Sequence, residues 1–283
     1  SIVLDDIRKR FAYSQAQGVS GVVLRTEWEN VLELSCFDNL NIINLIGAAK
    51  MAMNLKESDA EIITTWLREE GYLSDQTEDK CRIDTKGLTR FLLKTWDIME
   101  KTIYIDGFVF ATCSEFPLNI DKAWFTMTFY HSLAAWDKSA ASRLEMNYDN
   151  LLRLLKEKEE ALLEAKEFLK ELADNTFGLP EEGYLKLKEA FIHYDRYVKG
   201  FVLAAGACLI PSTLKGGTQT EMQREDLLRR LTETLGELED YINELKRFEE
   251  ETSYPYYVYL LCNYRNLQGI LEQGRMFLNS FRQ

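Results

Sequence analysis

The sequence predicts a mainly α-helical fold, a multi-helix bundle with a short β element near the N-terminus. Two observations lead to this class. Apolar residues recur at helical spacing through most of the 283 residues, and only one short run, VVLRT at residues 22–26, has the composition of a strand. Hydrophobic residues make up 46% of the chain, which is enough to build a sizeable core without disulfide bonds.

The first half of the chain begins with a predicted helix at residues 4–17, which Gly18 ends because glycine readily adopts the backbone conformation of a helix C-terminus. The VVLRT run then predicts a strand buried on both faces. Such a strand needs neighbouring strands to satisfy its backbone groups. Four helices follow in the prediction: residues 39–53, a helix opened by the capping box of Ser58 and Glu61 and ended by Gly71, residues 84–105, and residues 121–136 capped by Asn119.

The second half is rich in leucine, glutamate and lysine from about Lys138 onward, which is typical of long amphipathic bundle helices. Helices are predicted at residues 138–173, 181–209 and 221–250, with loops at residues 175–180 and 211–218, and an aromatic-rich segment closes the bundle. The sequence therefore predicts two regions. Residues 1–137 form a helical region with one strand, and residues 138–283 form a long-helix bundle.

The net charge and the cysteine pattern limit the classes of binding partner and the cellular compartment that we expect. A formal net charge of -12 repels phosphate backbones and anionic lipids, so we expect neither nucleic acid nor a membrane as a partner. The longest uncharged apolar stretch, residues 200–211, is about half as long as a membrane span requires. No signal-peptide order of regions is visible in the first residues. The five cysteines are odd in number, widely spaced and without a C-x-x-C pair, which favours a cytoplasmic setting over disulfides or a zinc site.

The densest polar cluster directly follows the predicted strand and contains Arg25, Glu27, Trp28 and Glu29. In parallel sheets and barrels, side chains at the carboxyl ends of strands project into the ligand cleft. A Trp ring can stack on a sugar ring while charged groups bond the hydroxyls. These four residues are therefore the candidate substrate-binding site for a polyhydroxylated ligand. The alternative is an arginine–glutamate pair that only ties a loop to a helix.

Other reactive residue types lack the spacing that catalysis or metal binding requires. His131 lies among aromatic residues on a predicted helix, and His193 follows Glu189 by four positions, without the repeated Glu-x-x-His pattern of a di-iron bundle. Neither a G-x-S-x-G motif nor a phosphate-binding loop is present. We therefore expect no metal and no cofactor, and the catalytic residues stay unassigned. The SYPYYVY group at residues 253–259 is typical of core or dimer contacts.

The segments LDDIRKRFAYSQAQGVSGVVLRTEWE and FDNLNIINLIGAAKMAMNLKESDAEIITTWLREEGY resemble the last helix, the last strand and the post-barrel region of (β/α)8 glycoside hydrolases, broadly of the α-glucuronidase kind. The later AWFTMTFYHSLAAWD resembles the helical part of those proteins, so the resemblance covers about residues 3–137. It implies that Arg25, Glu27, Trp28 and Glu29 form the rim of a sugar-binding cleft. A whole barrel takes about 250 residues. The resemblance therefore implies the C-terminal portion of a longer enzyme, without a complete pair of catalytic carboxylates.

Two functions compete at this point. The first is the C-terminal helical domain of a carbohydrate-active enzyme, whose partners are carbohydrate, the remainder of a longer chain and, through a dimer contact, a second copy. The second is a self-contained helical interaction or scaffold protein, which predicts a closed core without an unpaired strand. A third function, a helical enzyme with a pocket lined by Trp124, His131 and Trp136, has no motif behind it.

Overall fold

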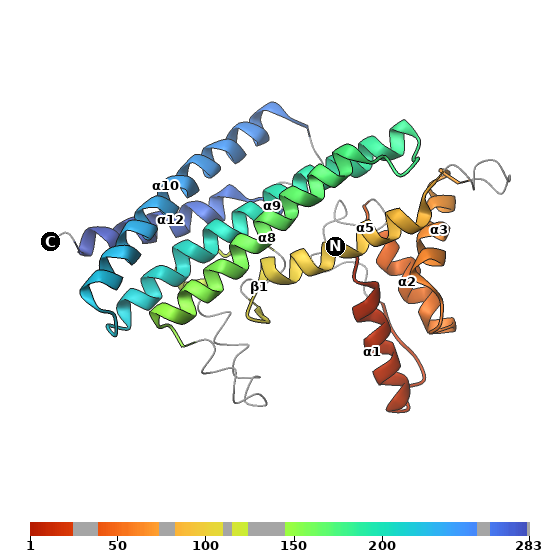
Figure 1. Cartoon of the computed structure of the whole chain (residues 1–283), viewed down its shortest axis with the longest axis horizontal. Coiled ribbons are helices and arrows are strands. Elements are labelled where there is room, and N and C mark those ends of the chain that lie inside the picture. The colour runs from red at the N-terminus through yellow and green to blue at the C-terminus, as the bar shows by residue number, and fades with distance from the viewer. Residues whose placement is uncertain (25–38, 74–82, 110–114, 124–144, 254–260, 282–283) are drawn as a thin grey trace. The chain divides into compact units, whose positions relative to one another are not determined.

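The computed structural model describes residues 1–24, 39–73, 83–109, 115–123, 145–253 and 261–281. These residues are mainly α-helical, which confirms the predicted fold class (Figure 1). The helices with described bounds are α1 (Leu4–Ala16), α2 (Ile42–Met53), α3 (Asp59–Glu69), α5 (Thr85–Ile103), α8 (Tyr148–Asp174), α9 (Glu181–Lys215), α10 (Glu221–Glu251) and α12 (Tyr264–Ser280).

Local sequence signals explain where several of these helices begin and end. The Ser58 hydroxyl accepts a hydrogen bond from the Glu61 N–H, and the Glu61 carboxylate accepts one from the Ser58 N–H, which forms the predicted capping box of α3. The predicted stops also hold, because Gly18 and Gly71 follow α1 and α3 with φ angles of 78° and 74°. Asn119 accepts a hydrogen bond from the N–H of Lys122, as the predicted cap requires, and residues 120–123 begin a helix.

The β structure of the described residues is a short antiparallel hairpin, not a strand near the N-terminus. Its strands are β1 (Tyr104–Ile105) and β2 (Phe108–Val109). The turn residues Asp106 and Gly107 have φ angles of 50° and 80°, the left-handed conformation that two-residue hairpin turns favour. The strand predicted at residues 22–26 is wrong for residues 22–24, which have no regular secondary structure, and residues 25 and 26 lie outside the described part.

The chain forms two compact units, and neither is one continuous segment. Unit 1 contains Ser1–Ile98 and Lys166–Ile192, and unit 2 contains Met99–Ala165 and His193–Gln283. The boundary predicted between residues 137 and 138 falls among residues 124–144, outside the described part, and stays a prediction.

Unit 1 is built on α1, α2 and α3 together with parts of the longer helices. The Arg8 side chain of α1 holds the turn between α2 and α3: its guanidinium donates to the carbonyl oxygens of Leu55 at 2.8 Å and Glu57 at 2.7 Å, and lies 2.5 Å from the Asp59 carboxylate. A second part of the core is aromatic. The Phe91 ring stacks on Phe168 at 3.9 Å between centroids, and it also contacts the rings of Phe177 and Phe191.

Unit 2 is dominated by α10 and α12, which run antiparallel side by side (Figure 1). A stripe of buried leucines at helical spacing faces inward from α10: Leu227, Leu231, Leu235, Leu238 and Leu245. Gly274 of α12 packs directly against Leu235, since a Cβ at Gly274 would lie 2.6 Å from that side chain. One turn further along, Arg275 and Glu239 form an ion pair of 2.5 Å. The absence of a side chain at Gly274 therefore lets the two helices pack closely at this position.

The loop predicted at residues 211–218 is wrong in its first part, because α9 continues through Pro211 to Lys215. Proline cannot donate to the carbonyl four residues earlier, so the sequence favours a break. The two residues after it make additional bonds within the helix: the hydroxyls of Ser212 and Thr213 donate to the carbonyls of Cys208 and Leu209, at 3.0 Å and 3.1 Å. Residues 211–214 are buried, and we attribute the continued helix to this tertiary packing.

Helix α9 is also the one helix of the described part whose length and composition would let it cross a membrane. In its most apolar window, 83% of the residues are buried inside the protein. A buried core helix passes the same test, so this gives only weak evidence for a membrane span.

Candidate functional site

The four predicted substrate-binding residues, Arg25, Glu27, Trp28 and Glu29, lie among residues 25–38, outside the described part. The same holds for the alternative pocket of Trp124, His131 and Trp136, and for the aromatic group at residues 254–259. Their roles stay predictions.

The segment that leads into Arg25 is an exposed apolar strip. Residues 19–24 have no regular secondary structure. Val23 is 97% exposed and Val19 is 52% exposed, and the side chains of Val22 and Leu24 are exposed as well. Valine and leucine in succession are typical of a buried strand rather than a surface loop. This segment therefore combines the composition of a buried strand with an exposed position and no regular secondary structure.

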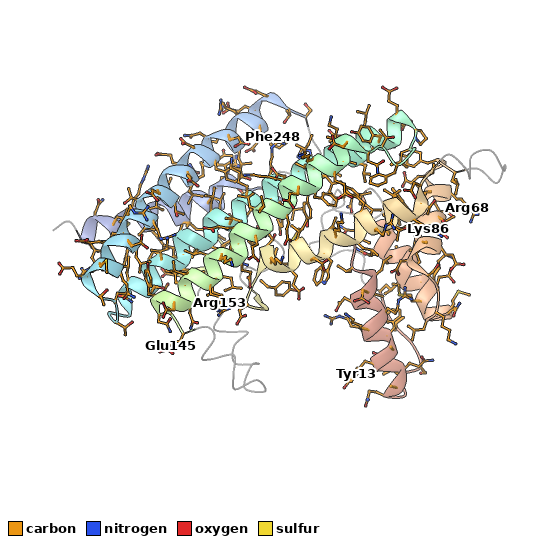
Figure 2. All side chains as sticks on the ribbon, viewed as in Figure 1. Tyr13, Arg68, Lys86, Glu145, Arg153 and Phe248 are labelled. Carbon is orange, nitrogen blue, oxygen red and sulfur yellow. The ribbon has the colours of Figure 1, made fainter. Side chains whose placement is uncertain are left out.

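The last turns of α1 add to the same exposed surface. Tyr13 is 69% exposed, and its ring points away from α2 and α3 in Figure 2. Ala12 and Ala16 are exposed next to it at helical spacing. Together with residues 19–24, these side chains form what we call the apolar edge of unit 1. Several exposed apolar residues in one short stretch of chain indicate an interaction site more often than isolated apolar residues do.

Lys158 of α8 is the most deeply buried charged side chain of the described residues. Its ammonium donates to the carbonyl oxygens of Lys101 and Tyr104, at the C-terminal end of α5, and lies 2.8 Å from the Glu157 carboxylate. Burial lowers the pKa of Lys158, and the Glu157 carboxylate opposes that shift. An ammonium has three donors, and all three have acceptors here. The arrangement caps α5, whose C-terminal dipole favours a cation, rather than presenting a nucleophile.

A second polar cluster surrounds Arg196 in unit 2. The His193 Nδ1 lies 3.2 Å from the Arg196 guanidinium, which also lies 4.1 Å from the centre of the Phe248 ring. The Tyr241 hydroxyl donates to the Arg196 carbonyl at 2.5 Å. Burial raises the pKa of Cys262 to about 12, so this thiol stays protonated at neutral pH and is a poor nucleophile. Across the described ranges, no three His, Cys, Asp or Glu side chains are placed to hold a metal ion.

Asp226 of α10 is the centre of a third network. Its carboxylate accepts hydrogen bonds from Arg230 at 2.7 Å, from Arg229 at 2.6 Å and from the Tyr148 hydroxyl at 2.9 Å. The bond from Arg230 is the largest of the causes that lower the pKa of Asp226 to about 2. In the same way, the bond to Asp226 raises the pKa of Tyr148. The network joins the start of α8 to α10 and is fully paired, which is typical of a structural tie.

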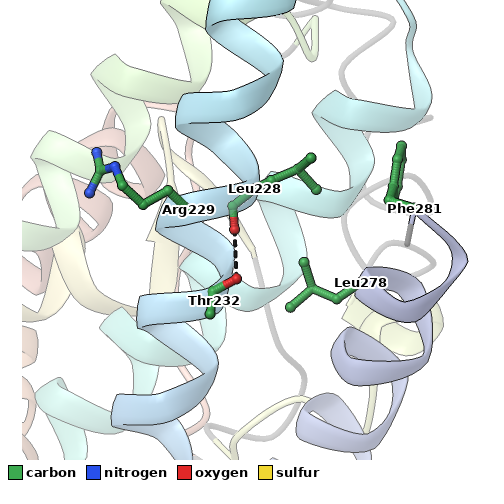
Figure 3. Close-up of a pocket in the computed structure, with 5 residues that line it drawn as sticks. All are labelled: Leu228, Arg229, Thr232, Leu278 and Phe281. Carbon is green, nitrogen blue, oxygen red and sulfur yellow. Dashed lines mark hydrogen bonds between the residues drawn. The ribbon is translucent and has the colours of Figure 1, made fainter. Parts of the chain in front are cut away.

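A cavity of about 210 Å³ opens between α10 and the end of α12 in unit 2. Its lining residues are Leu228, Arg229, Thr232, Leu278 and Phe281. Figure 3 shows the Leu228, Leu278 and Phe281 side chains pointing toward one another, whereas Arg229 points to the other side of α10. The Thr232 hydroxyl donates to the Leu228 carbonyl at 2.8 Å. Three apolar side chains therefore form one side of a lining that is mixed apolar and polar, and the Thr232 hydroxyl oxygen remains able to accept a hydrogen bond.

No sequence signal distinguishes Lys158 or Asp226, because each is one charged residue among many on a helix rich in Leu, Glu, Lys or Arg. Their importance comes from contacts with distant residues, 54 and 57 positions away for Lys158 and 78 for Asp226. The cavity was not predicted from the sequence, because its lining residues come from two helices about 50 positions apart in the sequence.

Comparisons with protein-family models, with curated proteins and with solved structures found no significant match to this chain. The resemblance to (β/α)8 glycoside hydrolases therefore stays a prediction.

Proposed function

We propose that this chain is the C-terminal helical part of a carbohydrate-active enzyme of the glycoside hydrolase kind. In this proposal, residues 22–24 pair with strands supplied by the remainder of the enzyme, and Arg25, Glu27, Trp28 and Glu29 reach its sugar-binding cleft. The observation that carries the proposal is the exposure of the apolar edge, whose strand-like residues directly precede that polar cluster.

The energetic argument concerns the apolar edge. Burying a valine or leucine side chain contributes about 1.5–3 kcal/mol relative to leaving it in water. For Val22, Val23 and Leu24, pairing in a sheet would therefore contribute several kcal/mol and would satisfy their backbone donors and acceptors. Within the described residues, strand pairing is confined to β1 and β2, so the partner strands would come from elsewhere. Polar residues at the carboxyl end of such a strand would face the ligand cleft.

The proposed role of the helices is support. Helix α1 precedes residues 22–24 and would cover one face of the added sheet, as the helices of parallel sheets do. The catalytic carboxylates would come from the remainder of the enzyme, so the chain alone would hydrolyse nothing. We also propose a cytoplasmic setting, which the free buried thiols of Cys208 and Cys262 support.

The test begins with the intact mass of the natural gene product. If several hundred residues precede Ser1, the full-length protein is assayed for hydrolysis of aryl glycosides and glucuronides. We expect Trp28→Ala to lower kcat/KM at least about tenfold, because an aromatic stack on a sugar contributes more than 1 kcal/mol. Glu181→Gln, an exposed residue on α9, is the control. A gene product that begins near Ser1, or a Trp28→Ala enzyme with unchanged kinetics, would refute the proposal.

A second candidate is a self-contained helical interaction or scaffold protein. The continuous leucine stripe of α10 and its antiparallel packing on α12 favour it, because such helices build stable bundles without any sheet. The same mass measurement separates the two candidates. A product of this length without hydrolytic activity would support the scaffold, and the apolar edge would then be its binding surface.

A further inference from the structure

Two cations stand beside the cavity between α10 and α12. The Arg224 guanidinium lies 4.7 Å from the centre of the Phe281 ring, and the Lys215 ammonium lies 5.7 Å from the centre of the Phe277 ring. The two rings are themselves 4.9 Å apart. Among the described residues, neither cation has a carboxylate partner, whereas the neighbouring Arg229 is bound by Asp226 and Glu233. Two cations without acidic partners among the described residues therefore lie beside one cavity.

The helix geometry places one of these cations in line with the cavity wall. Arg224, Leu228 and Thr232 follow one another at intervals of four residues, so they share one face of α10. Phe281 lines the cavity and carries the Arg224 guanidinium on its ring. Beyond the cavity, Leu235 packs tightly against Gly274. The Arg224 guanidinium therefore lies against one of the rings that line the cavity.

We propose that this cavity binds a small apolar carboxylic acid. The apolar body lies between Leu228, Leu278 and Phe281, and the carboxylate faces the Arg224 guanidinium, with Lys215 adding positive potential. A guanidinium matches a carboxylate with two parallel hydrogen bonds, and these are stronger than bonds between neutral groups. This site is independent of the carbohydrate proposal, because it lies in unit 2 and uses none of residues 19–29.

The volume limits the size of the ligand. A water molecule occupies about 30 Å³ in the liquid, so about 210 Å³ corresponds to roughly seven waters. Drug-sized ligands occupy cavities of about 300 Å³ or more. The site therefore fits one ring or one short branched chain with its carboxylate.

The two cations have another possible role, which the test must separate from binding. Positive charge near the C-terminal end of α12 stabilises that helix through its dipole, with or without a ligand. Loss of that role lowers the unfolding temperature. Loss of binding lowers the affinity for a carboxylate relative to a neutral analogue.

The experiment is isothermal titration calorimetry of the whole chain with 4-phenylbutyrate and with its uncharged amide. A ligand of about twelve non-hydrogen atoms, at roughly 0.3 kcal/mol per atom, has a Kd on the order of millimolar. We expect saturable binding of the acid in that range and binding of the amide at least about fivefold weaker. Arg224→Gln should remove most of the difference between acid and amide.

A second variant tests the place of binding. Thr232 is exposed, so Thr232→Trp fills the cavity with little risk to folding and should abolish binding of both ligands. Glu237→Trp adds the same ring at an exposed position of α10 outside the cavity lining, and it should bind like the unsubstituted chain. Unfolding temperatures confirm that each variant is folded. The proposal is overturned by absence of saturable binding at about ten times the expected Kd, by equal affinity for acid and amide, or by a Thr232→Trp chain that still binds.

Discussion

Among single side chains, the buried ammonium of Lys158 has the largest expected effect on stability. Its acceptors are the carbonyls of Lys101 and Tyr104 and the carboxylate of Glu157, so one side chain joins α8 to the end of α5 and to β1. Removing one partner of a buried charged contact costs more than the contact contributes, because the groups left behind have lost their water.

We therefore expect Lys158→Met to lower the free energy of unfolding by about 3 kcal/mol, measured by urea denaturation. Lys156→Met is the matched control on the same helix. Lys156 is exposed, and its nearest carboxylate, that of Glu160, lies 3.8 Å away. This control should change the free energy by less than about 0.5 kcal/mol. Equal effects of the two substitutions would contradict the capping role of Lys158.

The lowered pKa of Asp226 predicts that the protein loses stability as the pH becomes acidic. Its folded-state pKa of about 2 is below the usual aspartate value of 3.8, so the folded state favours the charged carboxylate. This contribution is complete above about pH 5 and is lost as pH falls through 3.8 toward 2. The side chain is partly exposed, so we expect only about 1 kcal/mol after solvent screening. Asp226→Asn should reduce the slope of the unfolding temperature against pH, measured between about pH 5 and pH 2.

The exposed neighbour Glu225 supplies the control for Asp226, because Glu225→Gln removes the same charge from the same helix outside the network. It should leave the slope of unfolding temperature against pH unchanged. If both variants flatten the slope equally, the net charge of α10 and not the Asp226 network governs the acid stability.

At the scale of helices, replacing two glycines of unit 2 by alanine should change the free energy of unfolding in opposite directions. A Cβ at Gly200 of α9 would overlap the Phe116 ring, which is packed between Tyr197 and Phe201. Gly236 of α10 has nothing within 4 Å of the same position. We expect Gly200→Ala to destabilise by about 2 kcal/mol and Gly236→Ala to stabilise by about 0.5–1 kcal/mol. Chemical denaturation measures both, and a stabilising Gly200→Ala would show that Phe116 can move aside.

Helix boundaries were predictable where a local signal sets them. The capping box of Ser58 and Glu61 and the stops at Gly18 and Gly71 depend on residues within one turn, so the sequence alone shows them. The loop predicted to begin at Pro211 is wrong, because the proline's local preference for a helix break is outweighed by tertiary packing. That packing cannot be deduced from the sequence near Pro211. The strand predicted from the VVLRT run is wrong for residues 22–24, because a strand-like composition forms a strand only when another strand pairs with it.

For the molecule as a whole, the apolar edge of unit 1 gives a prediction that differs between the isolated chain and a longer enzyme. Val23 is almost fully exposed, so Val23→Lys should change the free energy of unfolding of this chain by less than about 0.5 kcal/mol. It should also reduce light scattering at high protein concentration, because it interrupts contiguous apolar surface. In the longer enzyme that we propose, the same lysine would be buried in the sheet and should abolish hydrolysis.

Two controls accompany this substitution. Val23→Ile keeps the strand-like character and should leave hydrolysis intact, while Glu237→Gln makes the same change in net charge on α10. Full activity of the Val23→Lys enzyme would mean that residues 22–24 are not part of a sheet. The candidate sugar site could be predicted only as a cluster of residue types. Arg25, Glu27, Trp28 and Glu29 lie outside the described residues, and the cleft that we propose would depend on strands from the remainder of a longer enzyme.

The discontinuity of unit 1 also bears on how the protein is made. The aromatic core around Phe91 needs Phe168, Phe177 and Phe191, so this core cannot close until the chain has been synthesised to Ile192. From Ile98 to Ile192 the ribosome adds 94 residues, which takes roughly 5–20 s at about 5–20 residues per second. During that interval, the apolar sides of α1, α2, α3 and α5 lack their contacts with residues 166–192. Unit 1 is therefore most in need of chaperone protection while residues 99–192 are being synthesised.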